Sequence, residues 1–294
     1  MKVRVPASSA NLGPGFDTLA LALSLYVTVE VLPAPELAIV QRGYGSEIEC
    51  SRDHLAARVV RDVLGHDNVT IDIESSIPLA RGLGSSAALA VATAASAGAY
   101  DAFIVGAALD GHGENAAASY FGGLVGAAKI GDTYEAMNLA LDPRISSIVV
   151  IPEQKLSTQD ARSVLPKTIA LSDAVYNLQH LTLLLGGLAN LDLLVPEYGR
   201  DMIHELARER VYSPAKDLKD ILLGAGAAIA TWSGAGTSMI GLFDRYEANE
   251  KIEFVNKAIN EMDIDAVALV LEVDLEGLQL VGGDEYGEVE SKHE

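Results

Sequence analysis

Hydrophobic residues alternate with other residues along a long stretch near the N-terminus. Between Thr18 and Leu32 every second residue is leucine or valine, namely Leu19, Leu21, Leu23, Leu25, Val27, Val29 and Val31. Because successive side chains of a strand point to opposite faces, this pattern predicts a long, half-buried β-strand. The run Val69–Ile73 repeats the pattern over a shorter length. Such alternation is typical of antiparallel sheets with one wet face.

Other segments follow a helical period or form short apolar runs. Apolar residues three or four positions apart predict a helix over His54–Leu64. Ser85–Ala99 is rich in alanine and contains no proline, so we expect a second helix there. Two apolar runs predict strands at Leu124–Ile130 and Ile145–Ile151.

The pattern changes after Pro152, where helical segments dominate. The predicted helices are Thr158–Val164, Ser172–Leu191, Glu197–Arg210 and Glu247–Met262. The predicted strands are Ala227–Trp232, Ser238–Phe243 and Val267–Leu275. The acidic tail from Gly282 is expected to be loose. Strands and helices mix without regular alternation, so we predict an α+β fold with two subdomains, residues 1–152 and 153–294.

The charge of the chain excludes some classes of partner. The 294 residues carry a formal net charge of −20. Nucleic acids and anionic lipid surfaces both require a basic face, so we expect neither nucleic-acid nor membrane partners. An anionic substrate would need local cations or backbone N–H groups, because the field of the whole protein repels it.

Three further features indicate a cytoplasmic protein. Cys50 is the only cysteine, so no intrachain disulfide can form, which fits a reducing compartment. No unbroken apolar run follows the initial MKVR, and we therefore expect no signal peptide. The uncharged stretch Ile221–Phe243 is as long as a membrane span, but its glycine and hydroxyl residues favour a buried strand–turn–strand unit.

The segment Arg81–Ala90, RGLGSSAALA, is typical of a loop that opens a helix. Backbone N–H groups at a helix N-terminus are unpaired and lie at the positive end of the helix dipole, so they bind phosphate. Gly82 and Gly84 would let the chain approach a ligand closely, and Ser85 and Ser86 add hydroxyl groups for phosphate or Mg²⁺. The Gly-Lys-Ser/Thr of a Walker loop is absent. A structural alternative has the same sequence pattern, namely a glycine turn followed by a helix with a serine N-cap.

A dinucleotide site is a second interpretation of this loop. Gly82-x-Gly84-x-x-Ala87 fits the Rossmann fingerprint, and Asp101 lies nineteen residues after Gly82, near the position of a ribose-binding acid. That motif must directly follow a buried parallel strand. Here the preceding strand pattern alternates, and a polar segment separates it from the glycines. We therefore favour a phosphate loop over a dinucleotide fold.

Three blocks together resemble the GHMP small-molecule kinases. They are PASSANLGPGFD (Pro6–Asp17), PLARGLGSSAA (Pro78–Ala88) and SGAGTSMIGLF (Ser233–Phe243). The first block is most similar to the homoserine kinases of that family. Two further segments are similar to that family, HGENAAASYFGG (His112–Gly123) and STQDARSVLPK (Ser157–Lys167). The resemblance covers about residues 1–275.

The resemblance implies the two-subdomain GHMP-kinase fold, with a ribosomal-protein-S5-domain-2-like N-terminal half and a ferredoxin-like C-terminal half. It implies transfer of a phosphoryl group from ATP, with Mg²⁺, to the hydroxyl of L-homoserine on the route to threonine. The loop would wrap the ATP phosphates through Pro78, Leu79, Ala80, Arg81, Gly82, Leu83, Gly84, Ser85, Ser86, Ala87 and Ala88. Phosphoryl transfer depends mostly on positioning and charge stabilisation, so the missing Walker lysine is no defect.

The resemblance also implies residues for the amino and hydroxyl groups of the substrate. Asn11 and Asp17 would face the amino acid, with Asp17 pairing with its ammonium group. His112 and Asn115 would lie near the same ligand, Asn115 close to the reacting hydroxyl. Alternatively, Asn11 and Asp17 only stabilise turns, and His112 is a solvated loop side chain.

For the carboxylate of the substrate, the resemblance implies Thr158, Arg162 and a later arginine. Thr158 would contact the substrate and Arg162 would fork onto its carboxylate. We therefore expect Asn115, Thr158 and Arg162 to be catalytic. The later arginine aligns with Lys216, which offers charge without the planar fork. A helix start with surface charges is the alternative for Thr158 and Arg162.

The chain departs from the family pattern at the metal site. The interval Ala87–Gly111 is shorter than expected and contains no glutamate, although the family is expected to carry an Mg²⁺-binding glutamate there. Asp101 or Asp110 would take the place of this glutamate as an Mg²⁺ ligand, and Ser86 would be a further metal contact. His54 stands where an asparagine touching the nucleotide is expected.

These departures leave two alternatives open. One is a sister GHMP kinase with another alcohol, which Asp17 and Arg162 disfavour because they would be left unpaired. The other is a catalytically weak relative that binds a nucleotide without transferring phosphate. The uncharged segment Leu178–Leu191 is compatible with a homodimer contact or with a core.

Overall fold

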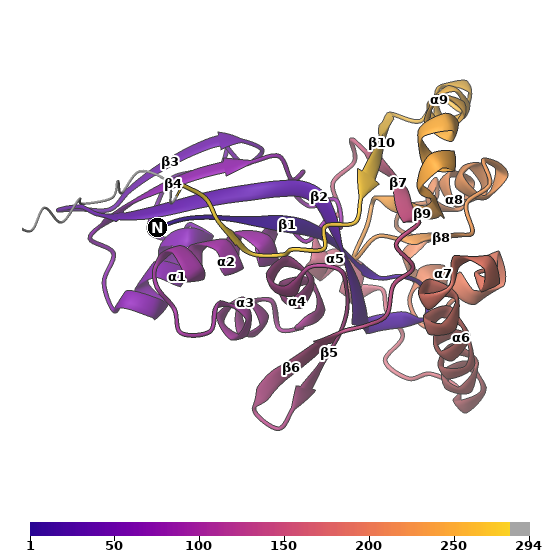
Figure 1. Ribbon diagram of the computed structural model, residues 1–294, viewed down its shortest axis with the longest axis horizontal. Coiled ribbons are helices and arrows are strands. Elements are labelled where there is room, and N and C mark those ends of the chain that lie inside the picture. The colour runs from indigo at the N-terminus through magenta and orange to yellow at the C-terminus, as the bar shows by residue number, and fades with distance from the viewer. Residues whose placement is uncertain (283–294) are drawn as a thin grey trace, which may run out of the picture.

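The computed structural model describes residues 1–282, apart from the side chain of Asp110. The tail that we expected to be loose falls on residues 283–294, which lie outside the described residues. A large sheet with its own helices forms one end of the molecule, and a smaller sheet with further helices forms the other (Figure 1).

The larger sheet contains seven strands from residues 1–282. They are β1 (Lys2–Asn11), β2 (Gly15–Pro33), β3 (Ala38–Gly43), β4 (Val69–Ser75), β5 (Leu124–Ile130), β6 (Thr133–Asn138) and β11 (Gln279–Leu280). The order is β11-β1-β2-β4-β3, with β5 paired to both β2 and β6. Every pair is antiparallel except β3 with β4. The described strands therefore form no doubly wound parallel sheet, which excludes the dinucleotide fold.

The alternation predicted for β2 is present along only part of the strand. Val27, Val29 and Val31 are buried while the residues between them are partly exposed. Between Leu19 and Leu23 every residue is buried. There β2 pairs with β5 as well as β1, and the strand continues toward the second half of the molecule (Figure 1).

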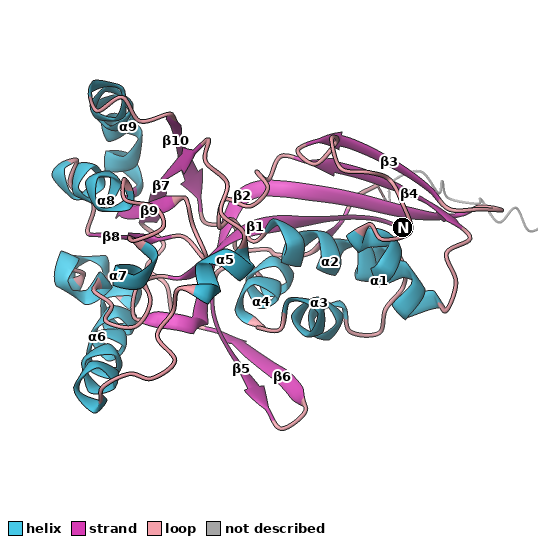
Figure 2. Ribbon diagram, turned by 180° about the vertical axis from the view of Figure 1, so that it is seen from behind, coloured by secondary structure: helices cyan, strands magenta, loops and turns pink. Residues whose placement is uncertain are grey.

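Helices α1 (Leu55–Leu64), α2 (Ser85–Ser96), α3 (Ala102–Asp110) and α4 (Glu114–Phe121) lie together on one face of the larger sheet (Figure 2). The residues of α2 from Ala90 to Ser96 are all buried, because small alanine side chains let the helix pack closely between its neighbours. The periodicity did not predict α3, since apolar residues surround most of its axis.

The smaller sheet contains four strands within the described chain. They are β7 (Ile145–Pro152), β8 (Ile229–Trp232), β9 (Met239–Asp244) and β10 (Ala266–Glu272). Their order is β10-β7-β9-β8, and all pairs are antiparallel. The helices of this end are α5 (Thr158–Ser163), α6 (Leu171–Ala189), α7 (Glu205–Arg208), α8 (Ala215–Gly224) and α9 (Arg245–Glu261). The division into subdomains at residue 152 stays a prediction.

The helix predicted over Glu197–Arg210 is wrong. A 3-10 turn at Pro196–Gly199 and the single turn of α7 replace it. The reason is Asp201, whose Oδ2 accepts hydrogen bonds from the backbone N–H groups of Ile203, His204 and Glu205 and so begins a new helix. The strand–turn–strand unit predicted over Ile221–Phe243 is wrong at its start, because the residues from Ile221 to Gly224 belong to α8.

Within residues 1–282, no helix has both the length and the apolar character to cross a membrane.

Candidate functional site

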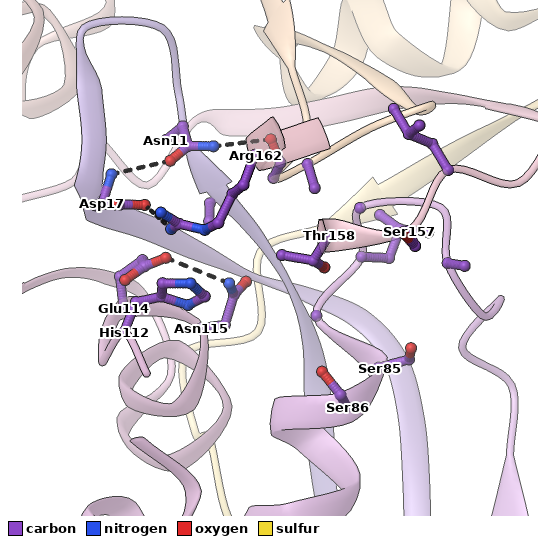
Figure 3. A pocket seen from close by; sticks show the side chains of 18 of the residues that line it. Asn11, Asp17, Ser85, Ser86, His112, Glu114, Asn115, Ser157, Thr158 and Arg162 are labelled. Carbon is purple, nitrogen blue, oxygen red and sulfur yellow. Dashed lines mark hydrogen bonds and ion pairs between the residues drawn. The ribbon is translucent and has the colours of Figure 1, made fainter. Parts of the chain in front are cut away.

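A cavity of about 270 Å³ brings together segments that are far apart in the sequence. Figure 3 shows Asp17 beside Arg162, with His112, Glu114 and Asn115 grouped below them and Ser85 and Ser86 at the start of a helix. The predicted site residues that line it are Asn11, Asp17, Ala80, Gly82, Leu83, Gly84, Ser85, Ser86, His112, Asn115, Thr158 and Arg162. Gly234 and Ala235, from the glycine turn between β8 and β9, also line the cavity.

The first turn of α2 lies at one end of the cavity. Its N-cap is Gly84, which has φ +64° and makes no side-chain capping bond. The first turn of a helix carries backbone N–H groups at the positive end of the helix dipole, so this end of the cavity suits an anion. A Cβ atom at Gly84 would lie 2.0 Å from Oγ of Ser8 and 3.1 Å from Oδ1 of Asn115, so only glycine fits here.

Arg81 anchors this loop instead of lining the cavity. Its buried guanidinium donates hydrogen bonds to the backbone carbonyl groups of Leu79, Pro152 and Glu153. The loop is thereby tied to the end of β7. Five residues of the predicted phosphate loop do not line the cavity: Pro78, Leu79, Arg81, Ala87 and Ala88. Their contact with ATP stays a prediction, and in this fold they support the loop or continue into α2.

An acid and a guanidinium meet at the other end of the cavity. Oδ1 of Asp17 lies 2.6 Å from Nη2 of Arg162, and each side chain is about one third exposed (33% and 34%). Asn11 holds the turn in place: its Oδ1 accepts the N–H of Asp17 at 3.0 Å, and its Nδ2 donates to the carbonyl of Gly234 at 2.8 Å. Asn11 therefore stabilises a turn and also lines the cavity.

The N-terminus of α4 supplies a third group of polar side chains. Asn115 accepts a hydrogen bond from the hydroxyl of Ser8 at 2.9 Å and contacts Oε1 of Glu114 through its Nδ2 at 3.4 Å. Glu114 is only 2% exposed and lines the cavity, although the sequence reasoning did not single it out. Its position beside Asn115 in the HGEN segment was the available signal.

The structure also brings in Arg208, which the sequence reasoning missed. Its side chain is buried, lines the cavity, and donates to the carbonyl of Gly234 at 2.8 Å. Burial lowers the pKa of Arg208 to about 10, while nearby Asp17 opposes this shift, so the guanidinium stays charged at neutral pH.

Lys216, predicted to take the place of a second carboxylate-binding arginine, is not at this cavity. It is exposed at the start of α8 and lines a separate cavity with Arg200 and Lys219. Arg208, at the end of the single turn of α7, lines the cavity instead. The sequence signal for Arg208 was its spacing from His204, because residues four positions apart lie on one face of a helix.

Asp101, one of the two predicted substitutes for the metal-binding glutamate, has a structural role in this fold, and the side chain of the other, Asp110, lies outside the described residues. It caps α3, accepting the N–H of Ile104 at 3.1 Å, and does not line the cavity. His54 likewise caps α1 through the N–H of Ala56 and contacts Gln41 at 3.0 Å, and burial lowers its pKa. Among the described residues, no three His, Cys, Asp or Glu side chains form a group that could hold a metal ion alone.

Comparison with known proteins identifies the family. Residues 51–123 match the model of the GHMP kinases N terminal domain, and residues 176–261 match the GHMP kinases C terminal model. The homoserine kinase of Moorella thermoacetica is 37% identical over 254 residues, covering 81% of this chain and 86% of its own length. That of Streptococcus equi subsp. zooepidemicus is 33% identical over 297 residues, covering 96% of this chain and 100% of its own.

A solved structure agrees with these sequence relatives. The crystal structure of homoserine kinase from Cytophaga hutchinsonii superposes with a TM-score of 0.82 at 26% identity, covering 95% of this chain and 96% of its own. The protein therefore belongs to the GHMP kinases, a family of ATP-dependent kinases, and within it to the homoserine kinases.

Proposed function

We propose that the protein transfers the γ-phosphoryl group of ATP to the side-chain hydroxyl of L-homoserine, giving O-phospho-L-homoserine. The observation that carries this proposal is one cavity with the N-terminus of α2 at one end and Asp17, Arg162 and Arg208 at the other. The first end suits a chain of phosphates, and the second suits a small zwitterion.

The phosphates of ATP fit the first turn of α2. Gly84, Ser85 and Ser86 line the cavity, and they form the start of the helix, where backbone N–H groups lie at the positive end of the helix dipole. Hydrogen-bond donors fixed in advance stabilise charge on the transferring phosphoryl group without reorganising during the reaction. The role of this loop is therefore positioning rather than proton transfer.

The cavity also fits a magnesium ion that shares its ligands with ATP. Mg²⁺ is commonly held by one or two carboxylates together with phosphate oxygens and water. The hydroxyl of Ser86 and the carboxylate of Glu114 both line the cavity and are oxygen donors of this kind. Charge on the β- and γ-phosphates is neutralised when Mg²⁺ is bound there.

The amino acid fits the charged end. Its ammonium group would pair with Asp17, and its carboxylate with Arg162 and Arg208. Before substrate arrives, Asp17 and Arg162 pair with each other. The ammonium group of a bound zwitterion would replace Arg162 as the partner of Asp17, and its carboxylate would replace Asp17 as the partner of Arg162. Each charged side chain would therefore keep a partner of opposite sign. The amide of Asn115 would orient the hydroxyl, and His112 and Thr158 also line the cavity.

Release of ADP tests this proposal. The purified protein with ATP and Mg²⁺ is expected to release ADP with L-homoserine, and far less with mevalonate or L-threonine. Faster release with mevalonate would point to a sister kinase. ATP binding without release of ADP under any of the three conditions would point to a nucleotide-binding relative without transfer activity.

The acidic charge and the absence of a membrane-spanning helix from residues 1–282 agree with a cytoplasmic location, which stays a proposal.

A homodimer is proposed as well. It is supported by α6, on which the large apolar side chains of Leu171, Leu178 and Leu183 are 81%, 64% and 48% exposed. Sedimentation equilibrium is expected to show twice the mass of one chain.

A further inference from the structure

His204 lies behind the cavity wall and contacts two parts of the site at once. Its side chain is fully buried. Its Nε2 is 2.9 Å from the carbonyl oxygen of Gly13, in the turn that joins β1 to β2 and carries Asn11. Its Nδ1 is 3.0 Å from Nη1 of Arg208. One imidazole ring therefore links the first turn of the chain to the arginine in the cavity.

The two partners determine which ring nitrogen carries the proton. The carbonyl of Gly13 can only accept, so Nε2 of His204 must donate. The guanidinium of Arg208 can only donate, so Nδ1 must accept. Only the neutral ring protonated at Nε2 satisfies both. Burial lowers the pKa of His204 and Arg208 lowers it further, while the carboxylates of Asp201 and Glu205 oppose the shift.

Further contacts hold the backbone and the ring of His204. Oδ2 of Asp201 accepts the backbone N–H of His204 at 2.6 Å, and Oδ1 of Asp201 accepts a hydrogen bond from Asn177 at 2.6 Å. The ring of Phe16 stacks on His204 with centroids 5.0 Å apart. The guanidinium of Arg208 lies 5.6 Å from the centre of the same Phe16 ring. A rigid ring between two fixed partners can transmit its position to both.

We propose that His204 is a positioning residue for the amino-acid end of the site, holding Arg208 and the Asn11–Asp17 turn in one geometry as the neutral ring protonated at Nε2. His204 does not line the cavity, so it acts through Arg208 and the turn. The part of this inference that concerns substrate rests on the proposed function, because it takes Arg208 to bind the carboxylate of homoserine.

Two substitutions separate the two hydrogen bonds. In His204→Gln the amide nitrogen takes the place of Nε2 and keeps the donor to Gly13, but Arg208 loses its acceptor. In His204→Asn the amide oxygen takes the place of Nδ1 and keeps the acceptor for Arg208, but the donor is lost. Because Arg208 then loses a hydrogen bond that its charge strengthens, His204→Gln is expected to raise the KM for homoserine at least tenfold.

The KM for ATP is expected to change less than about twofold in either variant, because the phosphate end has its own anchors. His204→Asn is expected to raise the KM for homoserine only about threefold, so the acceptor rescues binding. Equal increases in both KM values, or the same homoserine KM in both variants, would overturn the positioning role.

A second measurement uses the unaltered protein and needs neither substrate. Long-range ¹H–¹⁵N NMR reports which nitrogen of each histidine ring is protonated. The ring of His204, assigned through its backbone, is expected to show a protonated Nε2 and an unprotonated Nδ1 from about pH 6 to about pH 8. A proton on Nδ1, or a doubly protonated ring over that range, would refute the inference. Because this result is independent of turnover, it stays distinguishable from a failure of the proposed function.

Discussion

The proposed phosphate end and the proposed amino-acid end of the cavity differ in the groups that they offer to a charged ligand. The phosphate end comes from one continuous segment, Gly82–Ser86, and uses backbone N–H groups and glycine geometry. The amino-acid end uses charged side chains, Asp17, Arg162 and Arg208, which come from three separate segments. The first end depends on space for the backbone, whereas the second depends on how each charge is anchored. Substitutions should therefore affect different substrates at the two ends.

The largest effect is expected at the phosphate end, from Gly84→Ala. The new Cβ would lie 2.0 Å from Oγ of Ser8, so the loop or Ser8 must shift. Misplacement of about 1 Å at a catalytic site costs on the order of 100-fold in rate, and we expect kcat/KM for ATP to fall by about that factor. Steady-state kinetics with ATP varied measures it.

Gly98→Ala is the matched control for this substitution. Gly98 also has a positive φ, +87°, but no atom lies within 4 Å of a Cβ placed there. It shares the backbone strain without the clash, so kcat/KM is expected to stay within about twofold of the original protein while stability falls by about 1 kcal/mol. Equal losses in the two variants would mean that strain alone, and not contact with Ser8, explains the result.

At the amino-acid end, Arg208→Lys is expected to have the largest effect. The buried guanidinium donates to Gly234 and to His204 at once, which an ammonium group cannot reproduce with the same geometry. We expect the KM for homoserine to rise about 30-fold, equivalent to about 2 kcal/mol, with little change for ATP. Lys216→Gln is the control, and a comparable rise there would restore the role first predicted for Lys216.

Arg162→Lys is expected to have a smaller effect, because its side chain is 34% exposed and solvent weakens its ion pair. The KM for homoserine should rise about tenfold and the KM for ATP about twofold or less. Isothermal titration with homoserine alone checks the same point without turnover. An equal change in both KM values would contradict a role at the carboxylate.

Ser86→Ala is expected to have the smallest effect on turnover. The backbone N–H groups of α2 remain, and one exposed hydroxyl is lost. The expected fall in kcat/KM is about fivefold, as for one hydrogen bond of about 1 kcal/mol, and the Mg²⁺ concentration for half-maximal rate should increase. Unchanged kcat/KM and Mg²⁺ dependence would show that Ser86 touches neither phosphate nor metal.

Much of the secondary structure was predictable because local sequence decides it. Alternation along β2 and β4, and the alanine-rich start of α2, indicated their elements within a few residues. The helix predicted over Glu197–Arg210 was wrong because side-chain capping by buried Asp201, not periodicity, decides where α7 begins. The apolar helix α3 has no polar face to mark its period.

The sequence by itself determined the loop and helix start at the proposed phosphate end, since the glycines, the serines and the start of α2 are neighbours in the chain and the chemistry of a helix N-terminus is local. Only the tertiary structure decided the other end. It placed Arg208 rather than Lys216 in the cavity, and it used Asp101 as a helix cap. The physical reason is that a short helix shows one face to a distant segment, and packing against that segment selects which side chain faces the cavity.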